Sequence, residues 1–338
     1  MTQYPEIDQI ETTLRQAQKL VVIQADNPDG DSLASSLALE EILEEQGKEV
    51  VLYCGVDIPS YLHYLPGYSR VVNEMPKQFD LSIIVDTSSD SLLEQLDKGS
   101  AKSWLTTRPS LIIDHHSTPP TIQFATISSI HPAVATGEVI YEIAQQLKWK
   151  LNSRASELIA ISILSDSLGL TSEATSARSI HIIAELVESG VKLAELESAR
   201  REMMRREAEL IHYKGKLLQR VEFHYDESIA SITIPYEEII RYSPLYNPPM
   251  LVLDDMRLAR NTKIAIAFKL YSDGRITAKI RCNYGYGVGD KLAEHFGGGG
   301  HPYAAGFKIQ NGRDYAELKN DVLKKANELL EQLENSDD

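Results

Sequence analysis

Short apolar runs that alternate with helix-like stretches dominate the first half of this 338-residue chain. The apolar runs predict buried strands at residues 19–24, 49–53, 79–85 and 110–113, and helical patterns cover residues 6–19, 32–45, 135–147 and 153–164. Strands that alternate with helices are typical of βαβ units, which build a mainly parallel sheet with helices on both faces. Ligands of such sheets bind at the carboxyl ends of the strands, so the polar residues that directly follow these runs are the first candidates for a site.

The second half has a different texture. Residues 191–220 are helical and charge-rich, and they are followed by hairpin-like strand patterns at 221–224, 229–233, 262–271 and 275–283 and by an amphipathic helix at 315–333. We therefore predict an α/β protein with an N-terminal parallel-sheet domain over residues 1–190. A linker helix over 191–220 would lead to a smaller mixed-sheet α/β domain over 221–338.

The net charge, the cysteine content and the lengths of the apolar runs limit which partners and which compartment this chain is suited to. The chain carries 34 Lys and Arg against 49 Asp and Glu, a formal charge of −15, which argues against long duplex nucleic acid, because backbone binding relies on many cations. Two cysteines, Cys54 and Cys282, exclude a disulfide scaffold and favour a reducing cytoplasm. We expect neither a signal peptide nor a membrane span, since no apolar run approaches about 20 residues.

Two acidic motifs follow the first and third predicted strands. Asp29 and Asp31 flank a glycine in Asn27-Pro28-Asp29-Gly30-Asp31, directly after the first predicted strand. Asp86 directly follows the third predicted strand, at residues 79–85. Tight loops can bring such carboxylates into one site. The first motif alone is also open to a structural turn, and Asp86 alone is also open to a role as the N-cap of the next helix.

Two further clusters strengthen the case for a metal. Asp114-His115-His116 follows the fourth strand, and three consecutive ligand-type residues are uncommon in turns. Asp166 follows an apolar helical stretch, where capping and metal ligation are both open. Carboxylates with imidazole and without a thiolate cluster select a moderately hard ion such as Mn²⁺ or Mg²⁺.

The second half contributes a glycine-rich segment, Phe296-Gly297-Gly298-Gly299-Gly300-His301-Pro302-Tyr303-Ala304-Ala305-Gly306. Glycines allow backbone N–H groups to approach an anion closely, and His301 can donate to a phosphate. Arg281, near the end of a strand pattern, is a candidate phosphate clamp, with an ordinary surface arginine as the alternative. We predict that this region binds phosphate.

In this order, the motifs resemble those of the DHH phosphoesterases. Asn27–Asp31, Val85-Asp86, Asp114–His116 and Ser165-Asp166 are similar to family motifs one to four, and Gly297–Gly306 is similar to the GGGH-x-x-AAG signature of the DHH-associated C-terminal domain. Length and layout resemble the branch that contains nanoRNases, pAp phosphatases and cyclic-di-AMP or pApA phosphodiesterases. Family members often form homodimers.

The resemblance implies an active site in a cleft between the two domains, with two Mn²⁺ ions. Metal-activated water would hydrolyse short nucleotides there. Carried over by position, the implied metal ligands are Asp29, Asp31, Asp86, His115 and Asp166, with Asp86 between the ions. His116 would contact phosphate or support a ligand, and the implied catalytic set is His116, Asp86, His301 and Arg281. The implied substrate-binding residues are Arg281, Gly298, Gly299, Gly300 and His301.

One departure from the family pattern concerns the first motif. The family usually has histidine three residues before the proline, and here that position is Ala25, which cannot bind a metal. Asp26 is the neighbouring candidate to replace it. Ala25 also leaves open a weakened nucleotide-binding regulatory protein, while the first-half motifs leave open a polyphosphate or pyrophosphate hydrolase.

Overall fold

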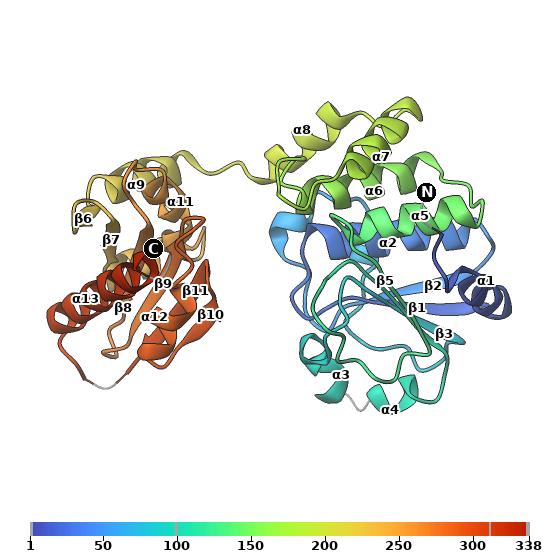
Figure 1. Ribbon diagram of the computed structural model, residues 1–338, viewed down its shortest axis with the longest axis horizontal. Helices are drawn as coiled ribbons and strands as arrows, with labels where there is room; N and C mark the ends of the chain where they lie inside the picture. Colours follow the sequence, from blue (N-terminus) through green and yellow to red (C-terminus); the bar gives the residue numbers. More distant parts are fainter. Residues whose placement is uncertain (1–2, 99–100, 311, 336–338) are drawn as a thin grey trace. The chain divides into compact units, whose positions relative to one another are not determined.

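The chain packs as two compact units, Met1–Arg205 and Arg206–Asp338. The computed structural model describes residues 3–98, 101–310 and 312–335. In Figure 1 the first unit runs from blue to yellow-green and the second from yellow to red. Each unit is built around its own sheet.

The first unit is built on a five-stranded parallel sheet, as predicted. Its strand order is β2-β1-β3-β4-β5, with β1 Lys19–Ile23, β2 Glu49–Tyr53, β3 Leu81–Val85, β4 Ser110–Asp114 and β5 Ile127–Ile130. Strand β1 pairs with β2 on one side and β3 on the other, so that Val21 lies between Val51 and Ser82. From β1 the chain adds β2 at one side of the sheet and then β3, β4 and β5 at the other, so the strand order reverses between β1 and β3. Open α/β sheets bind ligands at such a switch point.

Helices cover both faces of this sheet, which explains why its strands are continuously apolar. Helices α2 (Gly30–Glu44), α5 (Thr136–Gln146) and α6 (Ser153–Asp166) lie together on one side, and α3 (Glu94–Lys98) and α4 (Lys102–Leu105) lie on the other (Figure 1). Val22 packs with the α2 side, while Val21 and Ile23 pack with the opposite side. Helix α1 (Ile7–Gln16) packs into the α2-side core, and α7 (Ala177–Glu188) packs on α6.

The single connecting helix predicted over residues 191–220 is wrong. The segment forms two helices, α8 (Leu193–Met203) and α9 (Ala208–Leu218). Leu193 and Leu196 pack against the core of the first unit, whereas Leu210 and Leu217 are buried in the second. Because the apolar residues of the two halves are buried in different cores, the helical path is interrupted between them.

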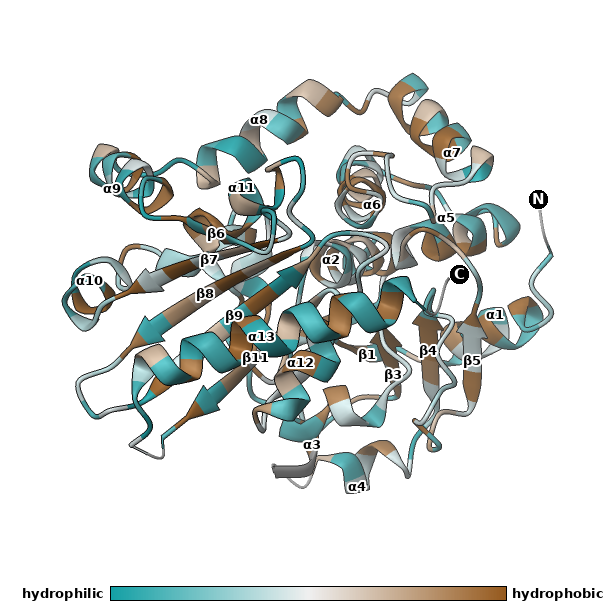
Figure 2. Cartoon of the chain, turned by 60° about the vertical axis from the view of Figure 1, so that its left-hand side comes forward, coloured by the Kyte–Doolittle hydropathy of each residue, from teal (hydrophilic) through white to brown (hydrophobic). Residues whose placement is uncertain are grey.

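The second unit contains a six-stranded mixed sheet in the order β10-β11-β9-β8-β7-β6. The strands are β6 Glu222–His224, β7 Ile229–Ile234, β8 Ile264–Leu270, β9 Ile276–Cys282, β10 Gly299–His301 and β11 Ala304–Ile309. Only the β7–β8 pair is parallel among the strand pairs described. Figure 2 shows β7 and β8 as largely hydrophobic, while β9 and β11 carry hydrophilic residues.

Two cores lie on opposite faces of this second sheet. One packs α12 (Gly289–His295) and α13 (Tyr315–Glu334) against residues such as Phe268 and Ile280. The other packs α9, α10 (Tyr236–Tyr242) and α11 (Leu253–Arg257) against β7 and β8. Alternating burial along β9 follows from this, since Ile280 is buried and Arg281 is half-buried on the other face.

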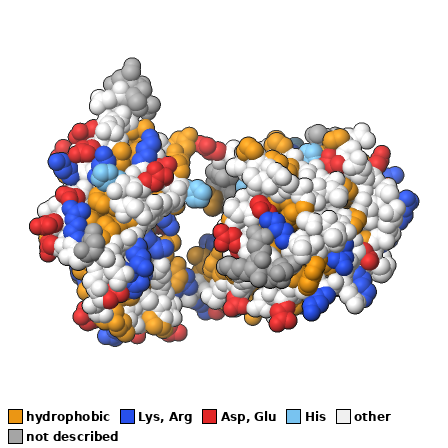
Figure 3. All heavy atoms as spheres, turned by 90° about the horizontal axis from the view of Figure 1, so that it is seen from below, with side chains coloured by type: hydrophobic (Ala, Val, Ile, Leu, Met, Phe, Trp, Pro, Cys, Tyr) orange, Lys and Arg blue, Asp and Glu red, His pale blue; other side chains and the backbone are white. Residues whose placement is uncertain are grey.

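The surface is mixed in charge. Figure 3 shows Lys and Arg side chains interspersed with Asp and Glu over the visible face of each unit. Among the described helices, none combines the length and hydropathy that crossing a membrane requires.

Candidate metal centre

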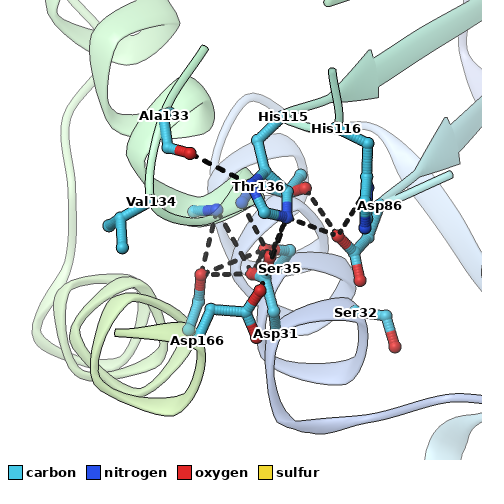
Figure 4. Close-up of polar contacts among 12 residues, drawn as sticks. Asp31, Ser32, Ser35, Asp86, His115, His116, Ala133, Val134, Thr136 and Asp166 are labelled. Atoms are coloured by element: carbon cyan, nitrogen blue, oxygen red, sulfur yellow. Dashed lines mark hydrogen bonds and ion pairs between the residues drawn. The ribbon is translucent and has the colours of Figure 1, made fainter. Parts of the chain in front are cut away.

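Four side chains predicted as metal ligands meet at the carboxyl edge of the first sheet. Asp31 lies in the first turn of α2, Asp86 directly follows β3, His115 directly follows β4, and Asp166 is the last residue of α6. Figure 4 shows their polar atoms converging from these four segments. We call these residues, Asp31, Asp86, His115 and Asp166, the four-residue cluster.

The His115 ring is the centre of this cluster. Its Nε2 lies 3.4 Å from Asp166 Oδ2, 3.5 Å from Asp86 Oδ1 and 3.7 Å from Asp31 Oδ2. Its Nδ1 lies 3.1 Å from the carbonyl oxygen of Ala133. That carbonyl can only accept, so Nδ1 carries the proton and, in the neutral ring, Nε2 presents a lone pair.

This arrangement fits a cation. His115 Nε2 is buried and has no hydrogen-bond partner among the described residues. A lone pair that faces three carboxylates is repulsive unless a positive charge lies between them. One imidazole with carboxylates is a donor set for Mn²⁺ or Mg²⁺, and a histidine fixed through its other ring nitrogen is the usual arrangement in metal sites. Asp31, His115 and Asp166 form one ligand group, and Asp86, His115 and His116 form another.

Two carboxylates of the four-residue cluster, Asp166 and Asp86, have raised pKa values. Burial, followed by the charges of Asp31 and Asp29, raises the pKa of Asp166 to about 7. The same causes raise the pKa of Asp86 well above its usual 3.8. Ionised carboxylates this close repel one another, and a bound divalent cation would offset that repulsion and favour their ionised form.

Asp31 is held by a network of donors from three helices. Its Oδ1 accepts from Ser162 Oγ at 2.5 Å and Ser35 Oγ at 2.9 Å. Its Oδ2 accepts from the backbone N–H of Thr136 at 2.7 Å, at the start of α5. Helix N-termini favour negative charge, so a fully buried carboxylate is stabilised here in one orientation.

Asp86 is fixed by an unusual backbone and by one side-chain donor. Its φ of 61° lies in the left-handed region, which Asp tolerates better than most residues. Its N–H donates to the Ile113 carbonyl at 3.0 Å, and its Oδ1 accepts from Thr136 Oγ1 at 2.9 Å. Strained backbone of this kind is concentrated at functional sites. The conformation turns the carboxylate toward His115.

Asp114 and His116 form a supporting pair. Asp114 is fully buried, and its Oδ1 accepts from the backbone N–H groups of His115 and His116 and from His116 Nδ1 at 2.7 Å. This hydrogen bond and the Asp114 charge raise the pKa of His116. The His116 side chain is 47% exposed, with Nδ1 3.9 Å from Asp86 Oδ1, so it lies at the open side of the cluster.

The first motif is only partly arranged as the sequence predicted. Asp29 is the N-cap of α2, and its Oδ1 accepts from the Ser32 N–H at 3.0 Å, a structural role that differs from the turn left open for it. Asp29 belongs to neither ligand group, so its part in metal binding stays a prediction. Asp26, the candidate to replace the missing histidine, also belongs to neither ligand group, and its carboxylate accepts from the Gln95 N–H at 2.9 Å, at the start of α3, so its part in metal binding likewise stays a prediction. Ala25 is buried and offers no ligand atom.

The glycine-rich segment of the second unit is an edge strand and not an open loop. Gly299–His301 form β10, which pairs with Ala304–Gly306 of β11. Close approach explains two of the glycines: a Cβ on Gly298 would lie 2.2 Å from the Gly306 carbonyl oxygen, and one on Gly300 would lie 2.6 Å from Ala305 Cα. An edge strand leaves outward N–H groups for another partner, so phosphate binding by Gly298–His301 stays a prediction.

Sequence reasoning missed the residues that position the ligands. Thr136, Ser35 and Ser162 carry buried hydroxyl groups. Spacing gave a signal, because Ser35 lies one helical turn after Asp31, and Ser162 lies one turn before Asp166. What the sequence lacked was the packing of α2 against α6, which brings the two serines within 3.4 Å of each other.

Comparison with known proteins agrees with this geometry. The DHH family, N-terminal domain, matches residues 19–163, and the DHHA1 domain matches residues 251–332. The "bifunctional oligoribonuclease and PAP phosphatase NrnA" of Thermus thermophilus is 25% identical over 312 residues, which cover 90% of this chain and 88% of that protein. The protein of the same name from Bacillus subtilis is 24% identical and covers 83% of this chain and 86% of its own length.

Among solved structures, an exopolyphosphatase-related protein from Bacteroides fragilis has a TM-score of 0.83 at 20% identity, with 97% of each chain covered. That likeness concerns the fold alone. Both family domains occur in order along the chain, and residues of the four-residue cluster lie in groups that could hold a metal ion. The protein therefore belongs to the DHH family of metal-dependent phosphoesterases, which hydrolyse phosphate esters.

Proposed function

We propose that this protein hydrolyses very short nucleotides, such as nanoRNA, pApA or pAp, with cyclic dinucleotides as a further substrate of the same class. The observation that carries the proposal is the position of His115 Nε2, buried and without a hydrogen-bond partner in the described chain, 3.4–3.7 Å from three carboxylates. The names of the two relatives, oligoribonuclease and PAP phosphatase, support the substrate class.

In the proposed reaction the four-residue cluster would hold the cation. A bound divalent ion would supply an acidified water and would neutralise charge on the phosphoryl oxygens. Ala133 keeps the proton on His115 Nδ1 so that Nε2 remains a ligand atom. His116, whose pKa is raised first by its hydrogen bond to Asp114, would donate from Nε2 to a phosphoryl oxygen or to the leaving ribose oxygen.

The metal content follows from the same residues. We propose one well-held ion, bound by Asp31, Asp86, His115 and Asp166, with Mn²⁺ as the expected metal and Mg²⁺ as an alternative. A second ion would share Asp86 and use Asp29, and it would bind weakly because Ala25 supplies no imidazole.

Substrate binding is proposed for the second unit. Arg281, Gly298, Gly299, Gly300 and His301 are the residues expected to bind the phosphate and the nucleotide. Arg281 is half-buried, its guanidinium donates to the neighbouring Ile280 carbonyl, and no ion pair is found for it among the described residues. A cation without a carboxylate partner is suited to an anionic ligand. Exclusion of long duplexes and formation of a homodimer remain predictions of the sequence.

Hydrolysis of pApA, pAp, a long RNA and pyrophosphate, each measured with Mn²⁺, Mg²⁺ and EDTA, tests the function. We expect turnover of pApA and pAp with a divalent ion, loss of turnover in EDTA, and no turnover of pyrophosphate. Asp86→Ala should abolish turnover, whereas Asp57→Ala, which changes an exposed aspartate of the same unit outside both ligand groups, should leave it unchanged.

Two results would contradict the proposal. Turnover of pApA that persists in EDTA would exclude the metal centre as its source, and cleavage of pyrophosphate alone would favour the inorganic substrate. The buried Ala25 gives specific support to one alternative, a weakened nucleotide-binding regulatory protein. That alternative predicts tight binding of pApA without turnover in any metal.

A further inference from the structure

One buried side-chain amide of the first unit has no hydrogen-bond partner. Gln24 is fully buried, and neither its Oε1 nor its Nε2 makes a hydrogen bond within the part of the chain that the structure describes. Such an amide can accept two hydrogen bonds and donate two. Burying it with none costs free energy, so the group calls for an explanation such as a bound water or ion.

Other polar side chains of this protein are paired by the packing itself. Ser82 and Ser110, two buried serines of the same sheet, form a hydrogen bond of 2.8 Å. In the second unit, the half-buried amide of Asn283 donates to two backbone carbonyls, at 2.9 and 2.7 Å. Gln24 differs from them and shares its unpaired state with His115 Nε2, the central atom of the four-residue cluster.

Strand register places Gln24 at the edge of the sheet that carries the cluster. Gln24 directly follows β1, and its N–H continues the pairing with β2 by donating to the Tyr53 carbonyl at 3.0 Å. The pairing of β1 with β3, continued by one residue, puts Gln24 level with Val85, the residue before Asp86. Neighbouring strands lie about 4.8 Å apart, so Gln24 and Asp86 are close neighbours at the carboxyl edge.

The side chain of Gln24 points toward the helices that contribute to the cluster. Side chains alternate between the two faces along a strand. Val22 packs in the core on the α2 side and Ile23 in the core on the opposite side, so Gln24 faces the α2 side. Helices α2 and α6, which supply Asp31 and Asp166, lie on this side (Figure 1). The unpaired amide is therefore buried on the same side of the carboxyl edge as the four-residue cluster.

A hydrated divalent ion would satisfy this amide. Carbonyl oxygens, like carboxylate oxygens and water, are suited to Mg²⁺ and Mn²⁺, and a water molecule can accept from the amide N–H groups. Gln24 also directly precedes Ala25, which is buried and offers no ligand atom. The amide thus provides an oxygen donor in the segment where the imidazole is missing.

We propose that Gln24 belongs to the metal centre, where its amide binds the hydrated divalent ion together with the four-residue cluster. This inference rests on the proposed function and deepens it, because it adds an uncharged oxygen donor to the carboxylates and the imidazole. An uncharged donor attracts the cation without adding to the repulsion between the carboxylates. The unpaired amide destabilises the metal-free fold, and the bound ion removes that penalty.

The experiment measures two quantities on the full chain. Calorimetric titration of the metal-free protein with Mn²⁺ gives the affinity, and urea unfolding in EDTA gives the stability without metal. Gln24→Met keeps the length of the side chain and removes both polar ends. We expect it to bind Mn²⁺ about 10- to 100-fold more weakly than wild type. Its urea midpoint in EDTA should equal or exceed that of wild type, because an unpaired buried amide is gone.

Two further variants separate a metal contact from a structural role. Gln24→Glu keeps the shape and an oxygen and adds a negative charge, so it should bind Mn²⁺ at least as tightly as wild type, while its metal-free fold should be less stable. Ser82→Ala is the matched control, since it removes a buried polar group of β3 on the opposite face of the sheet. It should lower the stability by breaking the hydrogen bond to Ser110 and leave the Mn²⁺ affinity unchanged.

Wild-type affinity for Mn²⁺ in Gln24→Met would overturn the inference, whatever the stability of that variant. Weaker Mn²⁺ binding by Gln24→Glu than by Gln24→Met would also overturn it, because a carboxylate beside the cation must attract it. Failure of the proposed function is recognised separately, since wild type would then neither bind Mn²⁺ nor hydrolyse pApA, and both ideas would fall. Normal Mn²⁺ binding and pApA hydrolysis by wild type, with unchanged affinity in Gln24→Met, would remove Gln24 alone from the metal centre.

Discussion

The hydroxyl of Ser162 is expected to set the affinity of the metal centre without being a ligand. It donates to Asp31 Oδ1 at 2.5 Å and accepts from the Gly137 N–H at 2.9 Å. Ser162→Ala removes a hydrogen bond to a charged group, which contributes about 1.5–3 kcal/mol. It also leaves the buried Gly137 N–H with only a long contact to Asp31, at 3.4 Å.

The expected size of the effect follows from what remains. Asp31 keeps the Ser35 hydroxyl and the Thr136 N–H, so its carboxylate stays near its position. A loss of about 1.5 kcal/mol corresponds to roughly tenfold weaker metal binding, the lower end of the tenfold to hundredfold range for residues that support metal ligands. Stability of the metal-free fold should fall by about 1–3 kcal/mol because of the unsatisfied N–H.

Calorimetric titration of the metal-free protein with Mn²⁺ measures the affinity, and urea unfolding measures the stability. Ser156→Ala is the matched control, a buried serine on the same helix whose side chain takes no part in the Asp31 network. Ser35→Ala should weaken metal binding in the same direction. The reasoning is refuted if both Ser162→Ala and Ser35→Ala bind Mn²⁺ as wild type does, or if Ser156→Ala loses as much affinity.

Three further predictions concern pH, close packing and the missing histidine. The pKa of Asp166 is about 7 in the metal-free fold against an ordinary 3.8, so between these pH values the folded state retains a proton that the unfolded chain has lost. The stability of the metal-free protein should therefore fall as pH rises through about 7, and the affinity for Mn²⁺ should weaken by about tenfold per pH unit below pH 7. Thermal unfolding and Mn²⁺ titration at pH 6–8 measure the two effects, and no change with pH in either would contradict the prediction. Gly137→Ala places a Cβ 2.1 Å from Ser162 Oγ and should lower the free energy of unfolding by about 1–3 kcal/mol. Gly215→Ala, in a helix with nothing within 4 Å of the added carbon, should raise it by up to about 1 kcal/mol. Equal urea midpoints for the two variants would show that the α5–α6 contact is not tight. Ala25→His should raise the bound Mn²⁺ from about one to about two ions per chain by elemental analysis, and an unchanged count would mean that residue 25 does not face the second ion.

Much of the fold was determined by patterns within single segments. Strands β1 to β4, the two mixed-sheet hairpin strands β8 and β9 and the last helix lie within three residues of their predicted ends, because continuous burial or period-two alternation is visible in the residues themselves. Strand β5 and helix α7 were missed, since Ile127–Ile130 is short and half polar and α7 lies in a segment with several turn residues. The helix over 191–220 was wrong because sequence periodicity cannot tell which core will bury each turn.

The amino-acid sequence by itself determined which ligand types this protein has and that most of them follow strand ends, and it predicted five metal ligands, Asp29, Asp31, Asp86, His115 and Asp166. Which of the neighbouring aspartates faces the four-residue cluster and which caps a helix was decided only by tertiary structure. Asp31 turns inward onto donors from α5 and α6, Asp29 caps its own helix and Asp26 caps another. The physical reason is that each carboxylate goes where donors satisfy its charge, and those donors come from segments more than 60 residues away for Asp26 and more than 100 residues away for Asp31.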